Sequence, residues 1–131
     1  MSGQQQLARQ LIDRARDDAN AADALVDVAA VSDAIVGFHA QQAVEKALKA
    51  VLSIGGVDYP FTHDLELLVA LADRAGIDIP DDLAEVPRLS PYAARLRYGD
   101  VRADTVDRAT ALLWARRALD WATQTLADSE R

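Results

Sequence analysis

The chain has 131 residues, of which 50% are hydrophobic and 5% aromatic, and its formal net charge is −7. This length fits one domain with its own core, and the surplus of alanine, leucine and valine favours packed helices over a β-sandwich. The absence of cysteine excludes disulfides, thiolate zinc sites and cysteine nucleophiles, and the negative charge argues against broad, non-specific binding to nucleic acid.

Two long helices are predicted in the first half of the chain. Apolar residues recur at three- and four-residue steps from about Gln5 to about Ala30, which predicts the first helix. Ser32-Asp33 offers an N-cap for the second helix, which ends at Gly55-Gly56 because glycine can adopt the left-handed conformation that closes a helix. No glycine or proline separates the two helices, so the N-cap alone marks the break between them.

The second helix carries an amide and a carboxyl group, Gln41 and Glu45, one turn apart among its apolar residues. They are either buried groups whose hydrogen bonds are satisfied by a neighbouring element, or a site that binds or activates a ligand. A carboxylate without a nearby acid, base or metal-ligand partner favours the structural interpretation. Lys49, one further turn along, can form an ion pair with Glu45.

Shorter helices are predicted next. Thr62 can cap a third helix, with Asp64 near its positive end, and Ala75-Gly76 ends it. Prolines then divide the following segment, in which Ser90-Pro91 is typical of an N-cap and first helical residue for a piece that runs to about Tyr98.

A last long helix is predicted from near Asp104 or Thr105 to about Leu126. No alternating strand pattern appears, so we expect an all-α, up-and-down bundle of three long helices plus shorter ones. We expect a single domain over residues 1–131, with residues 1–5 disordered and residues 127–131 frayed. The stripe that contains Trp114 and Trp121 fits either the core or a dimer interface.

Several chemical classes lack their motifs. His39 and His63 are the only histidines and have no HxxxH or HExxH spacing, so we expect no metal site. His39 lies on the polar face and is expected to be exposed, whereas His63 at a helix start can bond backbone or a carboxylate from the second helix. No membrane span or signal peptide is recognisable, so we expect a cytoplasmic protein.

Residues 88–108 are locally positive, with five arginines against three acidic residues. Such a cluster is most often solvated surface, although arginine forks also suit phosphate groups.

Three motifs resemble the HEPN domain family, which is all-helical and is named for its occurrence in higher eukaryotes and prokaryotes and for proposed nucleotide binding. They are FHAQQAVEKALKAVL at residues 38–52, THDLELL at 62–68 and RYGD at 97–100, in the family's order and spacing. The first motif is specific, the second supports it, and the third is weak alone. The family's usual RYP is here Arg97-Tyr98-Gly99, which leaves the turn after Tyr98 open.

The resemblance does not extend to the catalytic centre of the many HEPN proteins that are metal-independent ribonucleases. Their composite site across a dimer uses an arginine followed four to six residues later by histidine. No arginine stands at that position before His39 or His63, and no histidine follows residue 63. Without an imidazole there is no obvious acid or base for neutral pH, so we expect no catalytic residues and no cofactor.

What the resemblance implies is a bundle of about five helices, frequent homodimers, a nucleotide or phosphate site, and pairing with a minimal nucleotidyltransferase in toxin–antitoxin or related modules. The first hypothesis is therefore a non-catalytic homodimeric partner of such a nucleotidyltransferase, with nucleotide or RNA contacts. The alternatives are an RNA-cleaving toxin with a displaced active site and a stand-alone nucleotide-binding module. The candidate phosphate ligands are Arg95, Arg97, Arg102, Lys46, Lys49 and His63.

The resemblance also indicates what Gln41 and Glu45 do. Both belong to the first motif, and we expect them to anchor the turn of the second motif by accepting hydrogen bonds from Thr62, His63 or the free amides of that helix start.

Overall fold

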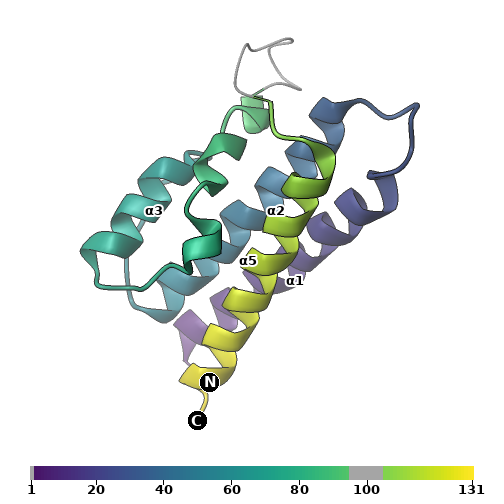
Figure 1. The fold of residues 1–131 in the computed structure, drawn as a ribbon. Coiled ribbons are helices and arrows are strands. Elements are labelled where there is room, and N and C mark those ends of the chain that lie inside the picture. The colour runs from purple at the N-terminus through teal and green to yellow at the C-terminus, as the bar shows by residue number, and fades with distance from the viewer. Residues whose placement is uncertain (1, 95–104) are drawn as a thin grey trace.

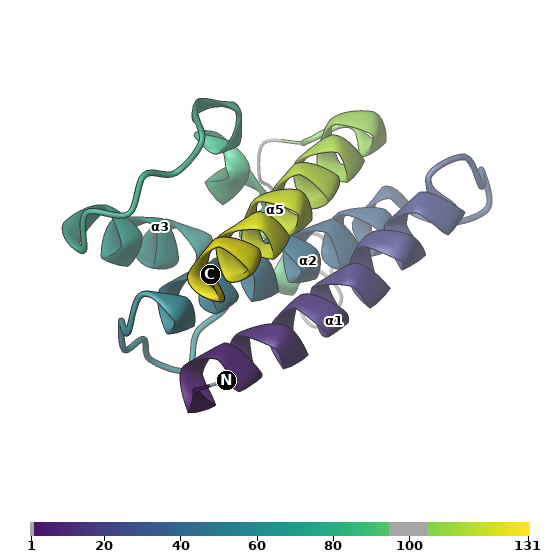
Figure 2. The same cartoon turned by 90° about the horizontal axis from the view of Figure 1, so that it is seen from below.

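The computed structural model describes residues 2–94 and 105–131. Three long helices, α1 (Gly3–Leu25), α2 (Asp33–Ile54) and α5 (Arg108–Ser129), lie side by side, and the two chain ends meet at one end of the bundle (Figure 1). The shorter α3 (Leu65–Arg74) and the 3₁₀ turns η1 (Asp81–Leu83) and η2 (Val86–Leu89) lie on one side, away from α1 (Figure 2). The all-α, up-and-down bundle predicted from the sequence is confirmed.

The centre of the bundle is α2, which packs against α1, α5, α3 and η2. Alanine occupies many of its contact positions, and Ala40, Ala43, Ala47 and Ala50 are fully buried. Small side chains let neighbouring helices approach closely, which explains why an alanine-rich sequence with few aromatic residues builds this core.

No helix within residues 2–94 and 105–131 is long and apolar enough to cross a membrane.

The helix ends differ from the predicted ones where distant contacts intervene. Instead of continuing to Ala30, α1 ends at Leu25, because the guanidinium of Arg108 binds backbone carbonyls of residues 25, 26, 28 and 31 and thereby stabilises a turn. The same side chain pairs with Asp33 at 2.6 Å. Arg108, one of the five clustered arginines, therefore fastens the α1–α2 connection to α5.

The start of α3 also differs. Asp64 rather than Thr62 is its N-cap, with Oδ1 accepting from the amides of Glu66 and Leu67. Thr62 supports the cap by accepting from the Asp64 amide. Ser90 follows η2 and accepts from the Leu65 amide at 3.0 Å, so its hydroxyl serves α3 instead of starting a new helix. The predicted helical piece is seen at residues 92–94, and its continuation to Tyr98 lies outside the described residues.

The chain is helical close to both ends, from Gly3 at the start of α1 to Ser129 at the end of α5. Ser2 and Gln5 form a capping box at the start of α1. Gln5 also donates to the backbone carbonyl and hydroxyl of Ser129, and Arg9 pairs with Glu130 at 2.9 Å. These contacts hold the two ends against each other, which is why α5 continues three residues beyond the predicted end.

The start of α5 has a local cap. Asp107 precedes the helix, and its carboxylate accepts from the amide and hydroxyl of Thr110, which lowers the pKa of Asp107. Farther along α5, the two tryptophans differ in exposure. Trp114 is buried, and Trp121 is half-buried against the same core.

Candidate functional site

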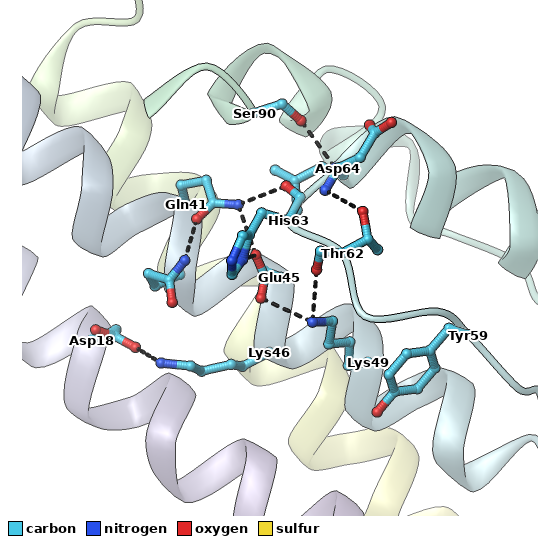
Figure 3. A network of polar contacts seen from close by, with 12 residues as sticks. Asp18, Gln41, Glu45, Lys46, Lys49, Tyr59, Thr62, His63, Asp64 and Ser90 are labelled. Carbon is cyan, nitrogen blue, oxygen red and sulfur yellow. Dashed lines mark hydrogen bonds and ion pairs between the residues drawn. The ribbon is translucent and has the colours of Figure 1, made fainter. Parts of the chain in front are cut away.

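Four buried polar residues follow one face of α2 at intervals of one turn, which we name the polar stripe: Gln41, Glu45, Lys49 and Ser53. Spacing of four residues places them on the same side of the helix. Gln41, Glu45 and Lys49 face residues 62 and 63 (Figure 3), and Ser53 lies beside Tyr59, in the segment that connects α2 to α3. A connecting segment packed against a helix needs partners for its backbone polar groups, and the polar stripe supplies them.

Gln41 and Glu45, the first two residues of the polar stripe, bind His63. The Gln41 amide donates to the His63 carbonyl and to Glu45 Oε1, both at 3.1 Å. The His63 ring lies with Nδ1 2.9 Å from the same Oε1. Because a carboxylate only accepts, this contact orients the ring with the N–H of Nδ1 toward Glu45.

Lys49 and Ser53, the last two residues of the polar stripe, contact Thr62 and Tyr59 of the connecting segment. The Lys49 ammonium donates to Glu45 Oε2 at 3.1 Å and to the Thr62 carbonyl at 2.8 Å. Its side chain is only 11% exposed. Ser53 lies 3.4 Å from the Tyr59 hydroxyl. Glu45 is thus a buried carboxylate whose charge is balanced by one buried ammonium and two further donors, and no buried side-chain nitrogen or oxygen of the described residues lacks a partner.

The rings of His63 and Phe61 are the exposed part of this network. The side chain of His63 is 44% exposed, and Phe61 is 94% exposed, more than any other large hydrophobic residue described. The rings meet edge to face with centroids 5.7 Å apart, and the Lys49 ammonium lies 5.9 Å from the Phe61 centroid. An exposed phenyl beside an imidazole of fixed orientation can stack on a planar group or contact a protein partner.

The structural polar network predicted from the sequence comes together, with one difference. Gln41, Glu45 and His63 meet as described above. Thr62 takes part through its backbone carbonyl, which accepts from Lys49, while its hydroxyl serves Asp64. The carboxylate therefore receives the His63 ring and not the Thr62 hydroxyl.

The candidate phosphate ligands are dispersed. Arg95, Arg97 and Arg102 lie outside the described residues. Lys49 is engaged by Glu45, and Lys46 lies on another face of α2, where its ammonium binds Asp18 of α1 at 2.5 Å. Among the described candidates, His63 has the most exposed side chain, at 44%.

His39 is not the exposed residue that its position on the polar face predicts. Its ring is half-buried and lies 3.1 Å from the second oxygen of Asp18. Asp18 thus joins α1 to two residues of α2. The sequence alone does not distinguish Asp18, because nothing local marks one of the several carboxylates of α1 as the one that contacts α2. Ser53, by contrast, could have been found by continuing the four-residue spacing.

No group of histidine, aspartate and glutamate side chains suited to hold a metal ion occurs in the part of the chain that the structure describes. The hydroxyl groups in this network belong to Ser53, Tyr59 and Thr62. Each of them has a hydrogen-bond partner, so none is a free nucleophile beside the Glu45–His63 pair. The described arrangement orients a histidine and fastens a loop.

Comparisons with known proteins agree with the fold. The model of the HEPN domain family matches residues 8–125. The crystal structure of TT1696 from Thermus thermophilus superposes with a TM-score of 0.60 at 32% sequence identity, and the match covers 94% of this chain and 95% of that one. No curated protein matches the chain.

Proposed function

Because the chain belongs to the HEPN domain family, we propose that it acts as a homodimeric, non-catalytic partner of a minimal nucleotidyltransferase in a toxin–antitoxin-like module. One observation carries the non-catalytic part. Neither histidine of the chain follows an arginine at the ribonuclease spacing.

The test of this function begins with the gene next to the one that encodes this chain. A small nucleotidyltransferase encoded there is expected to co-purify with this protein at a fixed ratio when the two are expressed together. The purified protein alone is expected to leave RNA intact in a cleavage assay. A separately migrating nucleotidyltransferase, or degraded transcripts, would contradict the proposal.

Nucleotide or RNA contact is a second part of the proposal. Arg95, Arg97 and Arg102 are its candidate phosphate ligands, since guanidinium forks match phosphate oxygens. The exposed rings of Phe61 and His63 could stack on a base. In a titration with labelled nucleotides, Arg97→Ala is expected to weaken binding at least tenfold. Unchanged affinity would remove Arg97 from the site.

The proposed homodimer fits the face between α1 and α5. There an open cavity of about 440 Å³ is lined by Leu112 and Leu113 among others, and Leu113 is 65% exposed. Asp27 and Arg116 line the same cavity, so the face carries both charge signs. A two-fold axis places one patch against its own copy. A patch with both charge signs can form such a contact, whereas a patch of uniform charge would repel its copy.

We therefore expect Leu113→Glu to shift the protein from dimer to a monomer of 14.2 kDa, because it buries two carboxylates across the axis. Analytical ultracentrifugation measures the change. Leu7→Glu, at an apolar residue 43% exposed near the start of α1, is the matched control and should stay dimeric. A Leu113→Glu variant with the wild-type mass would place the interface elsewhere.

A second candidate function, RNA cleavage with a displaced active site, is favoured by the Glu45–His63 pair. A buried carboxylate that orients a partly exposed imidazole is how a general base is held. His63→Gln should then abolish cleavage, while His39→Gln, which alters the other carboxylate-bound histidine, should retain it. Absence of cleavage by the wild-type protein would dismiss this function.

A further inference from the structure

The negative charge of this protein is concentrated in one segment. Residues 57–86 contain eight acidic residues and one basic residue, Arg74, which gives a formal charge of −7. The rest of the chain has 13 acidic and 13 basic residues and is therefore neutral. The segment comprises the connection after α2, then α3, η1 and the beginning of η2, and it covers one side of the bundle (Figure 2).

This acidic side contains an open apolar groove, which we name the α3 groove. It has a volume of about 470 Å³ and lies between α3 and residues 77–84. Its apolar lining includes Val69, Ala70, Ile77 and Ile79, which are all half-buried. A half-buried apolar lining is a place where a further apolar side chain can be taken out of water.

Four carboxylates surround this lining: Glu66, Asp73, Asp78 and Asp81. All four residues are exposed, and none forms an ion pair among the described residues. Other carboxylates nearby are engaged, since Asp82 pairs with Arg117 at 2.7 Å and Asp64 caps α3. The free carboxylates repel one another, and a cation placed over the groove would relieve that repulsion.

We propose that the α3 groove is the docking site for a cationic amphipathic segment of a partner protein. An apolar side chain of that segment enters the groove, and flanking lysine or arginine residues pair with Glu66, Asp73, Asp78 and Asp81. The inference deepens the proposed function, and it rests on that function for the existence of a protein partner.

The charge of the groove decides between possible occupants. A second copy of this chain would oppose four carboxylates with four more, which opposes a symmetric contact there. RNA phosphates would meet the same repulsion. A positively charged protein segment meets both the apolar lining and the carboxylates with complementary groups, and its attraction should weaken as salt rises.

The test uses a synthetic helical peptide as the probe, with leucine on one face and arginine on the other. We expect it to bind the full-length protein and to shift the amide NMR signals of residues 66–84. A second peptide, with the same arginines and with glutamine in place of leucine, should bind at least tenfold more weakly. Equal binding of the two peptides, or shifts confined to other elements, would overturn the proposal.

Charge reversal separates the groove from overall charge. Glu66→Lys combined with Asp73→Lys should weaken binding of the leucine-containing peptide at least tenfold and reduce its salt dependence. The control is Asp13→Lys combined with Asp17→Lys, which makes the same charge change at exposed positions on α1, away from α3. The control should change affinity less than threefold, and equal losses in the two variants would overturn the proposal.

Filling the groove gives an independent test. Ala70 is half-buried in the lining, so Ala70→Phe should occupy the space that the leucine of the peptide needs and weaken binding at least tenfold, with circular dichroism verifying that the helices are retained. Unchanged affinity in a folded variant would overturn the inference. The two experiments are independent. Peptide binding would support the α3 groove as a docking site even if no nucleotidyltransferase co-purified. Failure of the peptide to bind would overturn the groove proposal without affecting a positive co-purification result.

Discussion

The Glu45→Ala variant is expected to unfold at a melting temperature about 10 °C below that of the wild-type protein, from a loss of about 3 kcal/mol. Removing the carboxylate leaves the Lys49 ammonium, whose side chain is 11% exposed, without its counter-charge. It also removes one of the two acceptors of the Gln41 amide and the acceptor of the His63 ring. A buried charge without a partner is costly, so the effect should exceed that of any surface ion pair. Thermal and urea unfolding followed by circular dichroism measure it.

Glu85→Ala is the matched control. Glu85 is a second glutamate in an ion pair, but its side chain is 66% exposed and its partner Arg88 lies 3.5 Å away. Its loss should cost less than about 1 kcal/mol, because water already screens both charges. In the double variant Glu45→Ala with Lys49→Met, part of the lost stability should return, since no uncompensated ammonium remains. A Glu45→Ala protein as stable as wild type would contradict the role of the polar stripe.

The second large effect is expected at Gly37, where α2 meets the ring of Tyr92. A Cβ atom at position 37 would lie 2.2 Å from Cδ1 and 2.4 Å from Cε1 of that ring. Tyr92 is 1% exposed, and its hydroxyl accepts from the Val106 amide just before α5. The ring cannot move without disturbing the start of α5. We expect Gly37→Ala to cost about 2 kcal/mol, because overpacking of 1–3 kcal/mol outweighs the better helix propensity of alanine.

Gly3→Ala serves as the control for helix propensity. Gly3 is also a helical residue, but nothing lies within 4 Å of its Cβ position. That variant should keep or slightly raise the melting temperature. If both alanine variants melted together with the wild-type protein, the close approach of Gly37 and Tyr92 would be refuted.

The sequence predicted both ends of α2 correctly. Ser32 begins the second helix and Gly55 ends it, as predicted, because caps and periodicity act within one turn of the chain. The predictions were wrong at the end of α1, at the caps Asp64 and Ser90, and at the start of α5, which begins at Arg108 instead of near Asp104 or Thr105. At two of these points, the deciding partner is far along the chain: Arg108 for the end of α1, and the Leu65 amide for the Ser90 hydroxyl.

The candidate site shows the same division. The four-residue spacing of Gln41, Glu45 and Lys49 follows from the sequence. The resemblance to the HEPN family predicted that Gln41 and Glu45 contact the segment at the start of α3. The exposure of Phe61, the pairing of Lys46 and His39 with Asp18, and the use of the Thr62 carbonyl instead of its hydroxyl did not follow. Each depends on how two separate segments are packed.

By itself, the sequence determined the all-helical class, the caps at both ends of α2, the family, and the presence of polar groups on the inner face of α2. Helix periodicity and capping depend on residues a few positions apart, so a single sequence contains them. Only the tertiary structure decided that the polar stripe binds residues 59–63, that Arg108 fastens the α1–α2 connection, and that four carboxylates surround an apolar groove beside α3. Those facts depend on the packing of segments distant in the chain, and the packing is a property of all side chains together.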